Sequence, residues 1–280
     1  MPTAFTLAAP GIFGSRQNPG TFWQILQNLG LDGNMQWCFD AGDIASFATA
    51  ADQTWVNRGV SSPARDLTLG IDTGASTDDP AFVGTPGGLT GGEYFLFDGG
   101  DFFRITSPAS SAPAWVQSLH QDNAVWALGM WVQLASLSSA QGLFGTFDGN
   151  TASRGVYVRV ETSGQLRLWV GNGSGSYALA ITSTAAIPTG RPVFVGVTLD
   201  EAAGTGTMQI GATQESFTST YTSPTASNSS APIRVGSNTG TGSRILSGGR
   251  LHGLWLRSGT ATSAADMMAF YARSRQRFGF

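Results

Sequence analysis

The amino-acid sequence predicts an all-β protein in which two antiparallel sheets pack as a sandwich. Charged residues make up only 12% of the chain and glycines number 38, a composition typical of many short strands joined by turns. Candidate strands recur at intervals of about a dozen residues from 125 to 256, with polar turns between them. In addition, two aromatic segments in the run 94–105 flank the turn-forming residues 98–101, which read Asp-Gly-Gly-Asp.

Side chains in the second half of this run alternate as in a half-buried strand. Phe103 and Ile105 share one face, and Phe102 and Arg104 share the other. Another strand is expected over residues 125–132, whose two tryptophans need a broad apolar layer. We expect these strands at the centre of the sandwich.

Residues 1–35 are predicted to form an N-terminal arm, and residues 36–280 the sandwich domain. Proline and glycine are frequent as far as residue 20, so the start of the arm is expected to be irregular. A short amphipathic helix should follow, with Thr21 as its N-cap and Gly30 as its stop. Apolar residues at helical spacing form one stripe on it: Phe22, Ile25, Leu26 and Leu29.

This helix needs something to pack on, because a helix of about nine residues is unstable alone in water. The apolar stripe can pack on the chain's own domain or dock on another protein, and the sequence leaves both open. We assign Phe22, Ile25, Leu26 and Leu29 as candidate partner-docking residues.

A second helix is predicted over residues 263–276. Ser263 is a suitable N-cap, and Asp266 in the first turn complements the helix dipole. Arginines crowd the C-terminal end of this helix, and we expect them in solvent, with an anionic binding patch as the alternative: Arg273, Arg275 and Arg277.

The composition excludes several kinds of chemistry. All 15 basic residues are arginine, so P-loop, Schiff-base and Ser–Lys mechanisms have no lysine to use. A net charge of −3 with scattered arginines predicts no nucleic-acid partner. Cys38 is the single cysteine and is expected to be a small buried apolar residue. No apolar run approaches the ~20 residues of a membrane span, and no signal peptide is visible.

Several short motifs follow one another in a recognisable order. They are residues 38–43 (CFDAGD), 53–55 (QTW), 82–84 (FVG), 97–102 (FDGGDF), 128–132 (LGMWV), 195–200 (VGVTLD), 233–236 (IRVG) and 249–256 (GRLHGLWL). Across about residues 36–277, this pattern resembles the laminin-G-like, concanavalin A-like jelly-roll domains of bacteriophage structural proteins. Residues 1–35 have no counterpart in that pattern, and the segment 191–194 departs from it.

The resemblance implies a jelly-roll sandwich and a non-enzymatic role in a virion. We therefore expect a structural protein on the particle surface, as capsid decoration or as head or tail appendage, made in the cytoplasm of a bacterial host. Its partners would be other virion proteins, to which the N-terminal arm anchors it, and self-association is left open. The alternative is an adhesin that recognises host surface glycans. Glycoside hydrolysis is a remote alternative, because the fold type also occurs in hydrolases.

The acidic residues argue against a glycoside hydrolase. That chemistry needs two carboxylates facing one cleft, and on a strand they would stand two or four residues apart. The chain has four glutamates, Glu93, Glu161, Glu201 and Glu215, and none has another acid at that spacing. We predict no enzyme activity and no catalytic residues.

Two further kinds of site are weighed. A glycan site needs an exposed aromatic ring beside polar groups; Trp115 and Tyr177 are the candidates, with simple packing as the alternative for each. Two histidines and one cysteine do not make a dedicated zinc site. Calcium is the one cofactor left open, through Asp98, Asp101, Asp148 or the acidic residues of 72–79, although these residue types also form turns.

Overall fold

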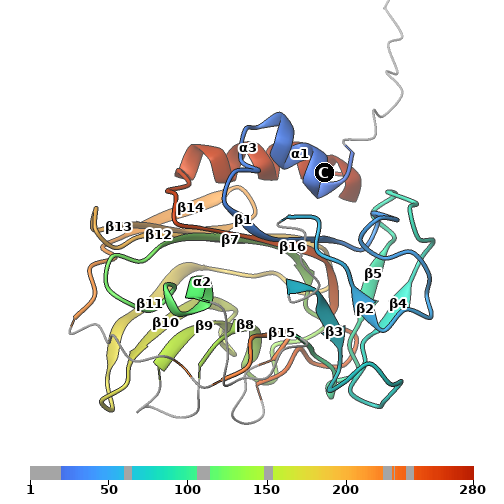
Figure 1. The fold of residues 1–280 in the computed structure, drawn as a ribbon, viewed down its shortest axis with the longest axis horizontal. Helices are drawn as coiled ribbons and strands as arrows, with labels where there is room; N and C mark the ends of the chain where they lie inside the picture. Colours follow the sequence, from blue (N-terminus) through green and yellow to red (C-terminus); the bar gives the residue numbers. More distant parts are fainter. Residues whose placement is uncertain are drawn as a thin grey trace, which may run out of the picture.

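The computed structural model describes residues 20–59, 65–105, 114–147, 154–222, 229, 231–237 and 243–280. In these parts two eight-stranded sheets pack face to face, and all their strand pairs are antiparallel (Figure 1). The all-β sandwich predicted from sequence is confirmed. Asp148 and residues 1–19 lie outside the described residues.

Sheet A has the strand order β14-β13-β12-β7-β16-β5-β4, and β1 also pairs with β16. Its strands are β1 (Met35–Asp40), β4 (Ala81–Val83), β5 (Tyr94–Leu96), β7 (Val125–Gln133), β12 (Val193–Asp200), β13 (Thr205–Ile210), β14 (Thr213–Phe217) and β16 (Arg250–Ser258).

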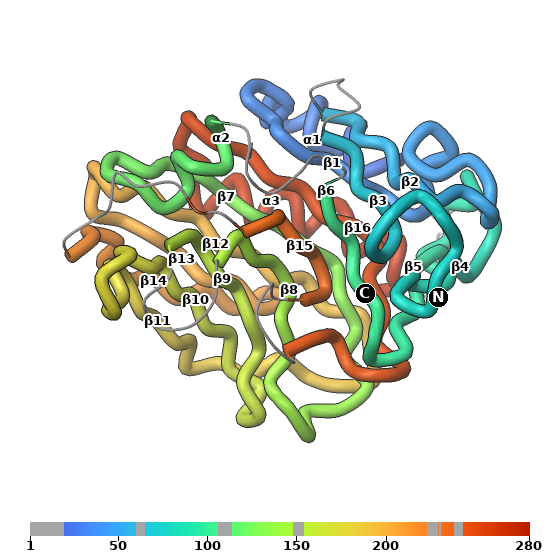
Figure 2. The backbone as a smooth tube through the Cα atoms, turned by 60° about the horizontal axis from the view of Figure 1, so that its bottom comes forward, coloured from blue at the N-terminus to red at the C-terminus, as the bar shows by residue number. Residues whose placement is uncertain are grey.

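Sheet B has the order β11-β10-β9-β8-β15-β6-β3-β2. Its strands are β2 (Thr54–Trp55), β3 (Leu67–Leu69), β6 (Phe103–Ile105), β8 (Gln141–Gly145), β9 (Arg154–Val160), β10 (Gln165–Asn172), β11 (Tyr177–Ala186) and β15 (Arg234–Val235). Figure 2 turns this sheet toward the viewer.

Helices cover the outer face of sheet A. These are α1 (Phe22–Asn28) and α3 (Ala264–Ser274), and the 3-10 helix η3 (Arg275–Phe278) continues α3. The short helix α2 (Ala114–Gln117) does not lie on this face. It packs against the inner core through Val116. Thr21 and Ser263 form capping boxes at the starts of α1 and α3, as their positions predicted. No helix in the described part is long and apolar enough to cross a membrane.

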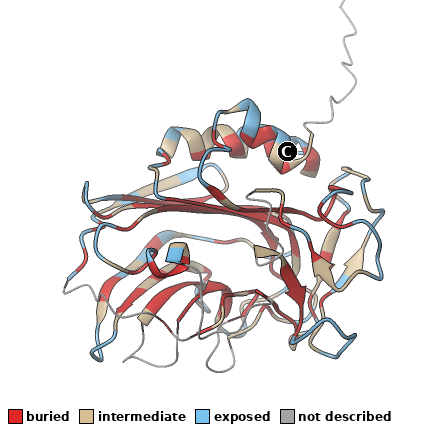
Figure 3. Ribbon diagram, viewed as in Figure 1, coloured by how far each residue is buried: buried red, intermediate tan, exposed pale blue. Residues whose placement is uncertain are grey.

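The protein has two apolar layers. The inner core lies between the sheets and takes residues such as Val158 of β9 and Leu128 of β7. The outer core lies between sheet A and the helices, where Trp131 and Trp255 from the sheet meet Phe270 of α3. In Figure 3 the helices are buried where they meet sheet A and exposed on the opposite side.

The aromatic run 94–105 joins the two sheets and does not form a hairpin. β5 pairs with β4 and β16 in sheet A, whereas β6 pairs with β3 and β15 in sheet B. The reason is that both strands point their phenylalanines into the inner core. The rings of Phe95 and Phe103 meet there with centres 4.9 Å apart, nearly perpendicular to each other.

At the opposite side of the sandwich, one side chain connects the edge strands of the two sheets. Glu215 of β14 accepts hydrogen bonds of 2.6 Å from the backbone N–H groups of Thr184 and Ala185 in β11. The edge of sheet A is therefore held to the edge of sheet B.

Candidate functional site

The outer face of sheet B is the face that the described helices leave uncovered. The two faces of β10 differ in burial. Leu166, Leu168 and Val170 are fully buried, whereas Arg167 and Trp169 are only partly buried. Such alternation is typical of a strand with one face in the core and one face toward water.

Strand register aligns five residues in one row across this face. Arg104 of β6 stands opposite Arg234 of β15, which stands opposite Gly145 of β8; Gly145 stands opposite Tyr157 of β9, which stands opposite Trp169 of β10. Directly opposed residues lie on the same face of a sheet. Arginines therefore mark one end of the row and aromatic rings the other.

An aromatic platform forms at the second end. The rings of Trp169 and Tyr177 stack with centres 5.1 Å apart and planes at 11°. The guanidinium groups of Arg159 and Arg167 lie over the Trp169 ring, at 4.1 and 4.6 Å from its centre. Tyr157 is buried beside Trp169, with ring centres 5.7 Å apart. We call Tyr157, Trp169, Tyr177, Arg159 and Arg167 the aromatic platform.

Glu161 fixes the two arginines of the platform. Both of its carboxylate oxygens accept hydrogen bonds of 2.7 Å from Nη2 of Arg159, and Nη1 of Arg167 lies 3.2 Å from Oε1. The side chains remain partly accessible, at 19% for Arg159 and 35% for Arg167. Aromatic rings held beside oriented hydrogen-bond donors are a combination suited to sugars, which present apolar ring faces and many hydroxyl oxygens.

The two candidate glycan residues fall in different places. Tyr177 belongs to the aromatic platform, whereas Trp115 of α2 packs edge-on against the core residue Trp37, with ring centres 5.5 Å apart, and Arg65 lies over it. The packing alternative therefore describes Trp115. Sequence reasoning missed Trp169, although the alternation of leucines with Arg167 and Trp169 in β10 would have placed it on the outer face.

The structure corrects the partner-docking assignment for most of the α1 stripe. Phe22, Ile25 and Leu26 are at most 1% exposed and belong to the outer core, where Phe22 meets Phe270 edge-on. Because these side chains are buried against the chain's own sheet, they are inaccessible to a partner protein. Leu29 is partly buried and packs at the margin of the same layer. Helix α1 is thus part of the folded domain.

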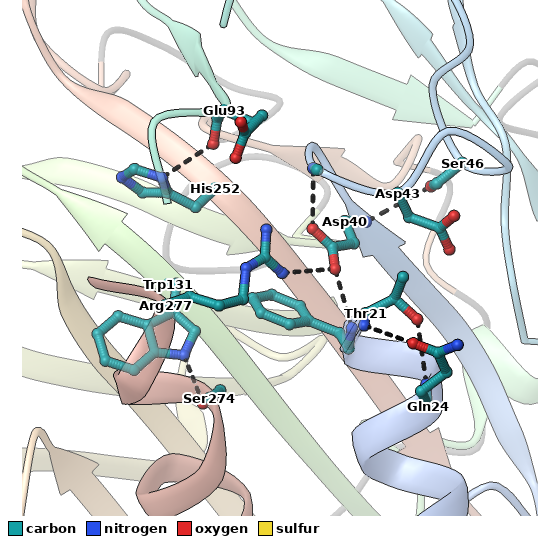
Figure 4. A network of polar contacts seen from close by, with 12 residues as sticks. Thr21, Gln24, Asp40, Asp43, Ser46, Glu93, Trp131, His252, Ser274 and Arg277 are labelled. Carbon is teal, nitrogen blue, oxygen red and sulfur yellow. Dashed lines mark hydrogen bonds and ion pairs between the residues drawn. The ribbon is translucent and has the colours of Figure 1, made fainter. Parts of the chain in front are cut away.

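A buried polar network lies beneath the helices (Figure 4). Arg277 of η3 and Asp40 of β1 form an ion pair of 2.7 Å in which both side chains are inaccessible, so the expected solvent position of Arg277 is corrected. Asp40 also accepts hydrogen bonds from the backbone N–H groups of Phe22 and Gly42. It therefore connects α1, β1 and η3.

His252 lies in the same region of sheet A and is also buried. Its Nδ1 lies 3.0 Å from the carbonyl oxygen of Glu93, so the neutral ring donates this hydrogen bond through Nδ1–H. Burial lowers the pKa of His252 to about 3; the bond to Glu93 opposes that shift, and the charges of Arg277 and Arg250 add to it. A neutral, enclosed imidazole of this kind supports the fold and offers no base to a substrate.

The acidic residues considered for calcium bind their own turns in the described part of the chain. Asp72 and Asp98 accept backbone hydrogen bonds from Gly74 and Gly100, and Asp101 accepts one from Asp98. Among the described residues there is no group of three or more His, Cys, Asp or Glu side chains that could hold a metal ion.

Two surface hollows lie away from sheet B's outer face. One, of about 330 Å³, is lined by Trp131, Tyr271, Phe280 and the β13–β14 turn. The other, of about 440 Å³, lies between the ends of β12 and β13 and the start of α3. The first hollow contains aromatic rings, so it is the competing place for a sugar.

Comparisons with known proteins agree with this architecture. Residues 105–264 match the family model of the concanavalin A-like lectin/glucanases superfamily, and the chain belongs to that superfamily. No curated protein matches the chain.

Solved structures of similar fold include domain 4 of AbnA, a GH43 extracellular arabinanase from Geobacillus stearothermophilus, in complex with arabinotriose. It is 14% identical with a TM-score of 0.52, and the match covers 85% of this chain and 98% of that one. Trypanosoma rangeli sialidase in complex with sialic acid is 11% identical with a TM-score of 0.53, over 85% of this chain and 32% of the sialidase. At these identities the likeness shows the fold alone.

Proposed function

We propose that this superfamily member is a non-enzymatic module displayed on the surface of a phage or phage-like particle, and that it binds host surface glycans through the aromatic platform of sheet B. The stack of Trp169 and Tyr177 with two oriented arginines is the observation that carries the binding role. The arabinanase domain of similar fold was solved with a bound sugar, which agrees with this proposal.

The non-enzymatic part rests on the distribution of carboxylates. The eight strands of sheet B contain no aspartate or glutamate. Glu161, just after β9, has both oxygens engaged by arginine. Glycoside hydrolysis needs two carboxylates flanking the scissile bond, one of them free to give a proton.

A glycan array probed with the purified chain tests the binding role. We expect Trp169→Ala and Tyr177→Ala to weaken binding at least tenfold, because a stacked ring contributes more than 1 kcal/mol to such contacts. Tyr271→Ala, in the hollow near Phe280, is the matched control and should bind normally. Loss of binding in Tyr271→Ala with retention in Trp169→Ala would move the site to that hollow and contradict the proposal. Incubation with the bound glycans should release no reducing sugar.

The particle role is supported by the sequence resemblance to phage structural domains. Particles purified from the bacterial host should contain the chain, and gold-labelled antibodies should decorate intact particles. A chain found only in the lysate supernatant contradicts display on the virion.

A further inference from the structure

We propose that Arg104, Arg234 and Arg244 form a subsite for an acidic group, a carboxylate or a sulfate, carried by a glycan. The inference rests on the proposed function, because it names the class of sugar that sheet B would prefer. We call these three side chains the arginine subsite.

Two of the three arginines lie over one phenylalanine ring, and the third stands beside them on the neighbouring strand. Arg104 and Arg234 are directly opposite each other on β6 and β15. The guanidinium groups of Arg234 and Arg244 lie 4.4 and 5.4 Å from the centre of the Phe102 ring, and that ring is only 2% exposed. Arg244 also donates a hydrogen bond to the carbonyl oxygen of Gly100, which fixes its position.

Two of the cations in this cluster stand directly opposite each other. Like charges placed directly opposite on a sheet destabilise it, and the strands of sheet B have no carboxylate with which to offset the repulsion. Asp78 forms an ion pair with Arg244, in which its Oδ1 lies 3.5 Å from Nη1. Burial lowers the pKa of Arg234, the charges of Arg244 and Arg104 lower it further, and Asp78 acts in the opposite direction.

Arg104 has hydrogen-bonding capacity that the fold does not use. Its Nε is buried and finds no acceptor within the described part of the chain. A buried donor without an acceptor costs free energy, and a guanidinium presents its donors in a planar fork that matches a carboxylate or sulfate. An acidic group bound between Arg104 and Arg234 would offset the repulsion between these directly opposed cations.

The arginine subsite and the aromatic platform belong to the same row of sheet B. Arg234 and Trp169 are separated by three strand-to-strand steps, through Gly145 and Tyr157. At a strand spacing of about 4.8 Å, this separation is about 14 Å. One oligosaccharide of a few sugar units can therefore contact the platform with a ring face and the arginine subsite with its acidic group.

Affinity electrophoresis in three polysaccharides tests the inference: polygalacturonate for carboxylate, dextran sulfate for sulfate, and neutral dextran. We expect the wild type to bind an acidic polysaccharide at least tenfold more tightly than the neutral one, and Arg104→Gln to remove that preference. Arg104→Lys should restore part of it. Arg273→Gln removes the same charge from an exposed position on α3 and should behave as wild type. Circular dichroism and a melting curve establish that each variant is folded.

A second measurement separates this inference from the proposed function. Sodium sulfate at constant ionic strength should raise the melting temperature of the wild type more than that of Arg104→Gln. Glycan binding without acidic preference, together with equal sulfate responses, overturns the arginine subsite and leaves glycan binding intact. Binding of no polysaccharide defeats the proposed function, and the sulfate comparison alone then decides whether the arginines hold an anion.

Discussion

The outer faces of the two sheets differ in how far they are buried. In sheet A, β7 is buried at eight of its nine positions, because the inner core covers one face and α1 and α3 cover the other. In sheet B, β10 alternates between buried and partly buried positions. The comparison teaches that the helices bury one outer face of the sandwich for stability, whereas the described helices leave the other outer face uncovered.

Charged side chains also differ between the outer faces of the two sheets. Beneath the helices, Asp40 and Arg277 neutralise each other in complete burial. On sheet B, Arg244 of the arginine subsite forms an ion pair of 3.5 Å with Asp78, and both side chains are about one-third exposed. The Asp40–Arg277 pair supports the fold, whereas we propose that the arginines on the outer face of sheet B bind an acidic group.

Breaking the buried pair should have the largest effect on stability. We expect Arg277→Met to lower the free energy of unfolding by about 3–5 kcal/mol, because it leaves the Asp40 carboxylate buried without its partner. Urea denaturation gives the measurement. Arg273→Met, at an exposed position, should change stability by less than about 0.5 kcal/mol, and the double variant Asp40→Asn/Arg277→Met should lose less than Arg277→Met alone. Equal stabilities for the Arg277 and Arg273 variants would show that the pair does not hold the helices on sheet A.

Truncating the α1 stripe comes next. Phe22→Ala should cost about 3–4 kcal/mol, because it opens a cavity between Phe270 and Arg277 in the outer core. Trp23→Ala, at a partly buried neighbouring position, should cost less. If Phe22→Ala instead stays as stable as wild type and loses only its association with particle proteins, the original partner-docking assignment is right and the burial of α1 is transient.

Acid should destabilise the fold through His252, which is buried in sheet A. The pKa of His252 is lowered in the fold, so the unfolded chain binds a proton below pH 6.5 and the folded chain only below about pH 3. The contribution of His252 to stability is therefore fully present above pH 6.5 and is lost as the pH falls from there toward about 3. Melting curves of wild type and His252→Gln across this range measure the difference. Parallel pH profiles would contradict a neutral buried imidazole.

The smallest effect on stability is expected on the uncovered face. Trp169→Ala should cost about 1 kcal/mol, since the stack and the contacts with Arg159 and Arg167 are partly solvated. The same variant should lose most glycan affinity. A loss of stability as large as that of Phe22→Ala would mean that the platform is part of the core, and the contrast between the two faces would disappear.

Local patterns in the sequence predicted local structure well. The strand over residues 125–132 is β7, and Thr21 and Ser263 begin the two helices as expected. These elements depend on hydrophobic periodicity and on caps, which neighbouring residues determine. The pattern 94–105 likewise revealed two strands, but only tertiary contacts decide that they enter different sheets.

The site could be predicted only in part, because it depends on distant partners. Tyr177 was selected from its place beside a turn, yet the contacts that define the platform join β10, β9 and β11. Arg277 was expected in solvent because its partner, Asp40, lies 237 positions earlier in the chain. A local sequence pattern does not predict which arginine is buried, because the register of the strands and the position of the helix determine its burial.

The bond between Glu215 and β11 has a consequence for association between copies of the chain. Edge strands with free backbone amides recruit strands from other molecules. Glu215 engages the amides of Thr184 and Ala185, so this side of the sandwich has fewer groups with which to pair with a neighbouring molecule. A single carboxylate thereby lowers the tendency of this edge to join the edge of another copy.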